Sequence, residues 1–185
     1  MNSKLRDRLL GLLILAAFPL YGVGSSLLVT ESAMLGLVLV LTNSLVVAGI
    51  GRILQGIAAP HGRAVGNSYL VARLLEAVLL GVSGYLVYRA GTADSGALYY
   101  RIAMIGLGIG SLPLLAVLIR GKQMPSWLGG SGIAGYLALI CGIVADGLGA
   151  VDVGLYLMLP GALFEVTFAF WLMIAGFARE MLDED

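Results

Sequence analysis

The sequence predicts an all-α integral membrane protein, a six-transmembrane-helix bundle whose N-terminus and C-terminus are both cytoplasmic. Of the 185 residues, 59% are hydrophobic and only 12% are charged, and the mean hydropathy is +0.98. Soluble domains are nearer half apolar and a quarter charged, and a small soluble domain cannot bury this much apolar surface. The formal net charge of zero gives no polybasic surface, so nucleic acid is not an expected partner.

Apolar runs of about 20 residues are long enough to cross a bilayer core of roughly 30 Å as helices. The expected helices of one single domain, 1–185, cover about 9–29, 33–55, 67–88, 98–119, 130–150 and 154–177. The charged start of the chain resembles that of a signal peptide. The apolar run after it is too long, and no small-residue cleavage site follows, so we expect a retained first helix. The short connection Thr30-Glu31-Ser32 predicts a tight hairpin between the first two helices.

Basic residues near the helix ends predict the orientation, because cytoplasmic loops carry an excess of Lys and Arg. A cytoplasmic N-terminus places most of them inside: Lys4, Arg6, Arg8, Arg52, Arg63, Arg120, Lys122 and Arg179. Arg89 and Arg101 are then outside, beside acidic residues. The lipid bilayer itself is the first expected partner.

Glycine is abundant, at 27 residues, and Gly106 and Gly110 form a GxxxG pair in the fourth expected helix. Small residues let membrane helices approach closely. Tight packing within the chain is the favoured interpretation, and oligomerisation through small-residue faces is the alternative.

Four polar residues interrupt the apolar runs and are the candidate substrate- or ion-binding residues: Asn43, Arg73, Glu76 and Glu165. A charge at the centre of a membrane helix costs about 2.5–3.5 kcal/mol, so such residues are expected to be paired or functional. The 1.5 Å rise per residue places Asn43, Glu76 and Glu165 near the middle of three different helices. Arg73 lies one turn from Glu76 on the same face.

Two interpretations of these residues stay open. Arg73 could pair with Glu76 or with Glu165 only to fix the helix register. Two acids and one base in a low-dielectric core cannot all be charged comfortably, so one carboxyl is expected to be protonated or to face water in a functional cavity. Proline supports the second interpretation: Pro160-Gly161 lies just over a turn before Glu165, where the carbonyl freed at Tyr156 could face the same cavity. Pro19 and Pro113 are further expected helix kinks.

Residue counts limit the chemistry. Cys141 is the one cysteine and His61 the one histidine, so neither a disulfide nor a bis-histidine haem is expected, and no metal site or cofactor is predicted. No Ser/His or paired-Asp arrangement is present, so no catalytic residue is assigned and the chain is not expected to be an enzyme. If the chain were an enzyme acting on a lipid, the residues expected to line its pocket would be Tyr69, Tyr136 and Tyr156.

Three segments resemble an integral-membrane family of unknown function, DUF4386. They are Tyr69-Leu-Val-Ala-Arg-Leu-Leu-Glu-Ala, Met124-Pro-Ser-Trp-Leu-Gly-Gly, and Leu159-Pro-Gly-Ala-Leu-Phe-Glu-Val followed by Phe170-Trp-Leu. The resemblance implies a multi-pass protein of a prokaryotic plasma (inner) membrane and no particular function. It places Arg73, Glu76, Pro160, Glu165 and Trp171 within the family's pattern. The connection between the first two helices is shorter than is usual there.

The leading functional hypothesis is a small transporter with a midplane Arg/Glu/Glu site, in which Glu76 and Glu165 bind a proton, a cation or a small molecule and Arg73 is their counter-charge. The alternative is a structural or regulatory membrane protein that packs with another membrane protein or with a lipid ligand. In that case the polar residues would only set the register of the helices.

Overall fold

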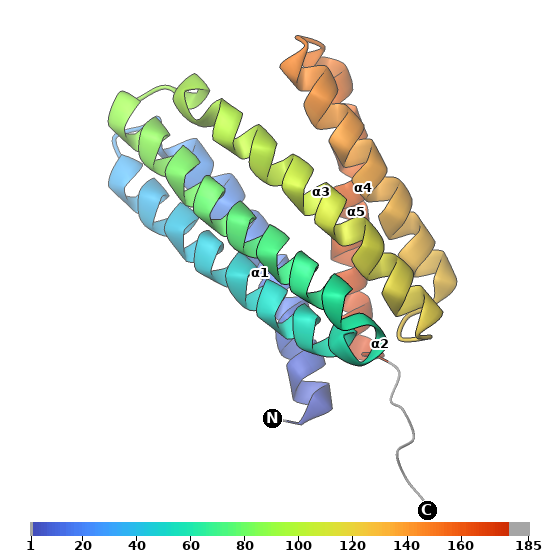
Figure 1. The fold of residues 1–185 in the computed structure, drawn as a ribbon. Coiled ribbons are helices and arrows are strands. Elements are labelled where there is room, and N and C mark those ends of the chain that lie inside the picture. The colour runs from blue at the N-terminus through green and yellow to red at the C-terminus, as the bar shows by residue number, and fades with distance from the viewer. Residues whose placement is uncertain (1, 178–185) are drawn as a thin grey trace, which may run out of the picture.

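The computed structural model describes residues 2–177, and within this range the chain is helical without strands. The helices are α1 (Ser3–Leu27), α2 (Ala33–Ala90), the short 3₁₀ helix η1 (Ala93–Gly96), α3 (Ala97–Arg120), α4 (Ser126–Gly147) and α5 (Val151–Ile174) (Figure 1). The five α-helices are all long and apolar enough to cross a membrane.

Helix α2 corrects the expected second and third helices. Instead of ending at residue 55 and restarting at 67, the two helical segments meet at Gly62, where the backbone is not helical (φ 174°, ψ 82°) and the chain reverses direction. Ala58 and Ala59 favour a helix, so the first segment continues beyond Arg52 and Gln55, the polar residues at which the sequence suggests an end. The two halves, residues 33–61 and 63–90, form a helical hairpin in which the Gln55 amide donates to Asn67 Oδ1 at 2.7 Å.

Three further helix starts lie earlier than the hydropathy predicts. Helix α1 begins at Ser3, because the Asn2 side chain accepts a hydrogen bond from the backbone N–H of Lys4 at 3.2 Å. Helix α4 begins directly after Pro125, whose extended backbone precedes the first turn. Helix α5 begins at Val151. Polar residues start these helices or lie in their first turns, which a hydropathy average does not detect.

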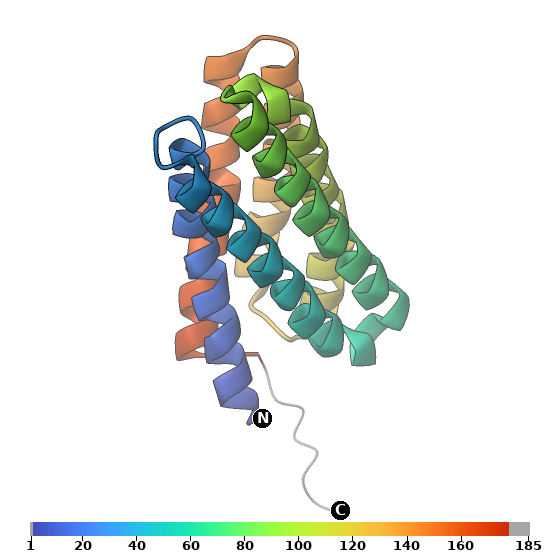
Figure 2. The same ribbon diagram turned by 90° about the vertical axis from the view of Figure 1, so that its left-hand side faces the viewer.

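The helices form a ring around a common interior. Each packs on its chain neighbours, and α1 closes the ring against α5 (Figures 1 and 2). Both described ends lie on the same side of the bundle as the bend of α2 and the connection 121–125. The opposite side carries the connection 28–32, η1 and residues 148–150 (Figure 1). We call these the terminal side and the opposite side.

Two contacts at the terminal side fasten α1 to the end of α5. The backbone N–H of Phe177 donates to the buried carboxylate of Asp7 at 3.2 Å, and Arg8 Nε donates to the carbonyl of Met173 at 3.4 Å. A Cβ added at Gly11 would lie 2.6 Å from the carbonyl oxygen of Ala169, so the two helices approach through a glycine here. The ring is therefore tightly closed on the terminal side.

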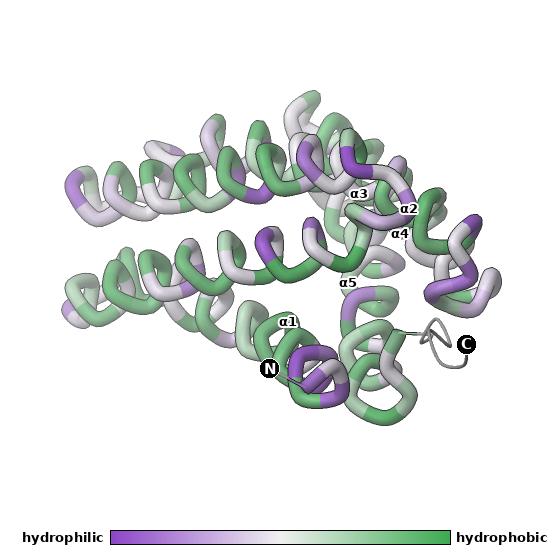
Figure 3. Tube along the Cα trace, turned by 60° about the horizontal axis from the view of Figure 1, so that its bottom comes forward, coloured by the Kyte–Doolittle hydropathy of each residue, from purple (hydrophilic) through white to green (hydrophobic). Residues whose placement is uncertain are grey.

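Hydrophobic residues make up much of every helix (Figure 3), and many large apolar side chains are exposed on the outside of the bundle, as is typical of a surface that faces lipid. Large exposed examples come from every helix, among them Leu12, Leu45, Val78, Ile109, Leu137 and Leu163. Several charged and amide side chains are instead buried in the interior, including Asn43, Arg73 and Glu76. This distribution is the reverse of that in a soluble bundle.

Glycines make the closest helix contacts within the chain, as expected. A Cβ at Gly135 of α4 would lie 2.9 Å from Gly161 Cα of α5, and one at Gly142 would lie 2.8 Å from the carbonyl oxygen of Gly154. Only one glycine of the GxxxG pair in α3 packs against another described helix. A Cβ at Gly110 would lie 2.5 Å from Ala72 Cβ, whereas a Cβ at Gly106 would have nothing within 4 Å among the described atoms.

Candidate central cavity

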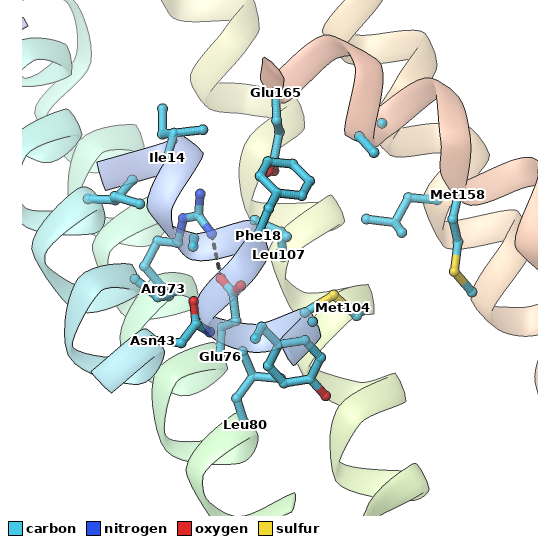
Figure 4. A pocket seen from close by; sticks show the side chains of 18 of the residues that line it. Ile14, Phe18, Asn43, Arg73, Glu76, Leu80, Met104, Leu107, Met158 and Glu165 are labelled. Atoms are coloured by element: carbon cyan, nitrogen blue, oxygen red, sulfur yellow. Dashed lines mark hydrogen bonds and ion pairs between the residues drawn. The ribbon is translucent and has the colours of Figure 1, made fainter. Parts of the chain in front are cut away.

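The ring of helices encloses a cavity of about 310 Å³, to which α1, α2, α3, α4 and α5 all contribute. The four residues that the sequence singles out, Asn43, Arg73, Glu76 and Glu165, all line it (Figure 4). The structure thus brings together side chains from both halves of α2 and from α5, which sequence analysis places only at a common depth. Their role in binding stays a prediction.

Arg73 and Glu76 form a buried ion pair on the second half of α2. Arg73 Nη1 donates to Glu76 Oε2 at 2.8 Å, and the side chains are 7% and 4% exposed. Arg73 Nε donates to the hydroxyl oxygen of Tyr69 at 2.7 Å, and the guanidinium carbon lies 5.4 Å from the centre of that ring. Of the two pairings open from sequence, Arg73 makes the one within its own helix.

Gly51 on the first half of α2 makes room for this pair. A Cβ at position 51 would lie 2.5 Å from the Cβ of Arg73, so the two halves of the hairpin approach closely only because residue 51 has no side chain. Arg73 is thereby held between the halves, with its guanidinium directed along α2 toward Glu76 (Figure 4).

Glu165 enters the cavity from α5 and has a different environment. Its Oε1 accepts a hydrogen bond from the Tyr136 hydroxyl of α4 at 2.8 Å. Within residues 2–177, no Lys or Arg nitrogen lies within 4.0 Å of its carboxylate, and the residue is only partly buried. Because Arg73 and Glu76 balance each other, the carboxyl of Glu165 is in excess in the cavity.

Pro160 and Gly161 position Glu165 rather than supply a ligand. Gly161 lines the cavity and packs on Gly135, which holds α5 against α4 near the Tyr136–Glu165 contact. Tyr156 does not line the cavity and is 71% exposed. The expectation from sequence that its carbonyl faces the cavity is therefore wrong. Of the three tyrosines considered as pocket residues, Tyr136 lines the cavity and Tyr69 lines the smaller space beside it.

Two buried oxygens have no hydrogen-bond partner among the described residues: Asn43 Oδ1 and Ser111 Oγ. Asn43 is 2% exposed and lines the central cavity beside the ion pair (Figure 4). Ser111 of α3 lines a smaller space of about 20 Å³, which it shares with Tyr69, Arg73, Tyr136 and Glu165. That volume is enough for about one water molecule. A buried acceptor without a donor costs about 1–3 kcal/mol, so Asn43 Oδ1 favours a donor from a ligand or water.

The wall of the cavity toward the opposite side is apolar and aromatic. Phe18 and Tyr21 of α1, Tyr100 and Met104 of α3, and Met158 of α5 line it. The rings of Tyr21 and Tyr100 stack with centroids 5.7 Å apart, joining α1 to α3. Sequence analysis missed these residues, because aromatic and methionine side chains in apolar runs do not differ from ordinary core or lipid-facing residues.

The cavity reaches the surface of the bundle beside α1, where Phe18 and Gly22 line it and are exposed. Toward the terminal side, buried apolar residues fill the interior: Leu54, Leu114, Leu115, Leu118, Phe164 and Phe168. The polar residues therefore lie at the bottom of a pocket that is closed beyond them. Among residues 2–177, no group of three or more His, Cys, Asp or Glu could hold a metal ion.

The comparisons with known proteins agree with the sequence resemblance. Residues 85–176 match the family described as Domain of unknown function (DUF4386). This part of the chain belongs to that family. It contains the Tyr136–Glu165 contact, Pro160 and Trp171, whereas the segment with Arg73 and Glu76 lies outside the matched residues. No curated protein and no solved structure gives a significant match to the chain.

Proposed function

We propose that the chain is a small transporter with the central cavity as its substrate or coupling-ion site. The observation that carries the proposal is the meeting of Arg73, Glu76, Glu165 and Asn43 in one hollow between the helices. Ionisable residues inside membrane helices are costly, and they mark ion and substrate pathways in many membrane proteins. A pocket that reaches exposed residues and is closed toward the terminal side is compatible with one state of an alternating-access carrier.

The proposal includes six membrane crossings, two of them by the halves of α2, in a prokaryotic plasma membrane. Each half of α2 is long enough to cross a bilayer core at 1.5 Å per residue. Basic residues concentrate on the terminal side: Lys4, Arg6, Arg8, Arg52, Arg63, Arg120 and Lys122. Arg179, placed inside by the sequence argument, lies outside the described residues. This asymmetry supports cytoplasmic termini, with the closed end of the cavity toward the cytoplasm.

A structural or regulatory role is the second candidate, and one observation favours it. The Arg73–Glu76 pair is satisfied within its own helix and needs no ligand. A register-setting pair, however, accounts neither for the partly buried Glu165 nor for a hollow of about 310 Å³ beside it. A role in binding a partner membrane protein would use the outer surface, where Gly106 is uncovered, and would leave the cavity without a purpose.

Proton flux in liposomes tests the transporter proposal. The purified chain is reconstituted into vesicles that contain a pH-sensitive dye, and a potassium gradient with valinomycin makes the lumen negative. We expect faster acidification of the lumen than in protein-free vesicles. Glu165→Gln should remove the difference while keeping the fold, because the amide oxygen can still accept from Tyr136.

Asp146→Asn is the matched control for this experiment. It also removes one carboxylate, but from a partly exposed pair with Arg101 that does not line the cavity. This variant should acidify like the unmodified chain. Equal acidification by Glu165→Gln and the unmodified chain, or no difference between the unmodified chain and protein-free vesicles, contradicts the proposal.

A further inference from the structure

We infer that the central cavity binds a small amphipathic ammonium ion: a molecule with a protonated amine that carries N–H groups at one end and an apolar body at the other. The inference rests on the proposed function and names the class of its substrate. Three features of the cavity lead to it: its charge, its unpartnered acceptors and its apolar wall.

The charge of the cavity selects a cation. Arg73 and Glu76 balance each other at 2.8 Å, and Glu165 adds a carboxyl that no described cation contacts. In a space surrounded by apolar side chains and lipid, an unbalanced carboxylate attracts a positive ligand more strongly than it would in water. Glu76 already balances the charge of Arg73, so an anionic ligand would add a second unbalanced negative charge beside Glu165.

The unpartnered acceptors select an N–H donor rather than a metal ion. Asn43 Oδ1 is buried and has no donor among the described residues, and for Glu165 the structure shows one hydrogen bond, to Oε1. An ammonium group can donate to several such oxygens. Hard metal cations bind most strongly where several free carboxylates meet. Only two carboxylates line this cavity, and Arg73 already holds one of them.

The apolar wall selects an amphipathic molecule. Phe18, Tyr21 and Tyr100 present aromatic surface, and Met104 and Met158 add flexible thioethers. Aromatic faces attract cations and bury hydrocarbon, while methionine adapts to irregular shapes. A volume of about 310 Å³ is at the small end of ligand pockets, so the expected ligand has about one ring or one short chain.

Isothermal titration calorimetry with three matched compounds tests the inference. The full chain in detergent micelles is titrated with 4-phenylbutylamine, 4-phenylbutanol and 4-phenylbutyrate, with protein-free micelles as the blank for partitioning. These compounds share the same apolar body and differ in the charge of the end group. We expect the amine to bind about tenfold more tightly than the alcohol, or better, and the carboxylate to bind more weakly than both.

Three variants assign the binding to the cavity. Glu165→Gln should weaken amine binding by about tenfold and leave the alcohol within about twofold, because only the charge is lost. Asn43→Leu should weaken the amine by about threefold or more, since an acceptor is removed at nearly constant volume. Asp146→Asn, outside the cavity, should change neither compound.

Equal affinity for amine and alcohol overturns the inference, as does tighter binding of the carboxylate, which would identify an anion site at Arg73. Amine affinity unaffected by Glu165→Gln overturns it as well. The outcome is separable from the transporter proposal. Proton flux that depends on Glu165 without amine binding supports the transporter proposal and contradicts the inference about the ligand class. Amine binding without proton flux supports the inference about the ligand class and contradicts the transporter proposal.

Discussion

Glu76 and Glu165 are the same residue type at a similar depth, yet their surroundings differ. Glu76 is 3% exposed and bonded to Arg73 in its own helix, with Tyr69 behind the arginine. Glu165 is partly buried and receives one hydrogen bond, from Tyr136 of a neighbouring helix. The difference is that the chain itself supplies a counter-charge for Glu76, whereas Glu165 has none among residues 2–177.

Removing the base of the buried pair should have the largest effect. Arg73→Met leaves Glu76 buried without a counter-charge, which costs about 3–5 kcal/mol of unfolding free energy. The measurement is unfolding of the detergent-solubilised protein by increasing fractions of sodium dodecyl sulfate. The double variant Arg73→Met with Glu76→Gln should recover much of the loss, because no charge is then unpaired. A single variant as stable as the unmodified chain contradicts the pairing.

Filling the space beside Arg73 should have the next largest effect. Gly51→Ala places a Cβ against Arg73 Cβ and forces the halves of α2 apart, costing about 1–3 kcal/mol on the same unfolding measurement. Gly49→Ala is the matched control, because nothing described lies within 4 Å of a Cβ there. It should be neutral or slightly stabilising, since alanine favours a helix over glycine. Equal effects of the two variants would mean that the hairpin halves do not meet at position 51.

The Glu165 region should respond more weakly. Tyr136→Phe removes one hydrogen bond and leaves the ring in place, so it should cost about 0.5–1.5 kcal/mol. In the flux experiment it should alter the rate without abolishing it, because Glu165 remains. Destabilisation as large as that of Arg73→Met would show that Glu165 is as structural as Glu76, and the contrast between them would fail.

The partly exposed pair on the opposite side should matter least. Arg101 Nε and Asp146 Oδ2 lie 2.9 Å apart, with side chains 36% and 25% exposed. Asp146→Asn should change the unfolding free energy by less than about 1 kcal/mol, because water screens such pairs. A larger loss would make this variant unsuitable as the control for Glu165→Gln.

Sequence analysis predicted the helical class because hydropathy reports directly on burial in lipid. It predicted that Asn43, Arg73, Glu76 and Glu165 deserve attention, because polar residues are conspicuous in apolar runs. The Arg73–Glu76 pair could be predicted from the sequence, since residues at i and i+3 lie on the same face of a helix. The Tyr136–Glu165 contact could not be predicted, because it depends on how α4 packs on α5 through Gly135 and Gly161. A connection between residues 55 and 67 was predicted, but the extension of both helical segments up to Gly62 was not, because Pro60 and Gly62 favour an earlier break.

Carbodiimide labelling tests the contrast between the two carboxyls most directly. Membranes that contain the full chain are treated at neutral pH with a hydrophobic carbodiimide, which reacts with a carboxyl that can take up a proton and that the reagent can reach. Mass spectrometry then locates the modified residues. The account predicts modification of Glu165, protection of Glu165 by 4-phenylbutylamine, and little modification of Glu76. Modification of Glu76 in preference to Glu165, or of neither residue, would contradict it.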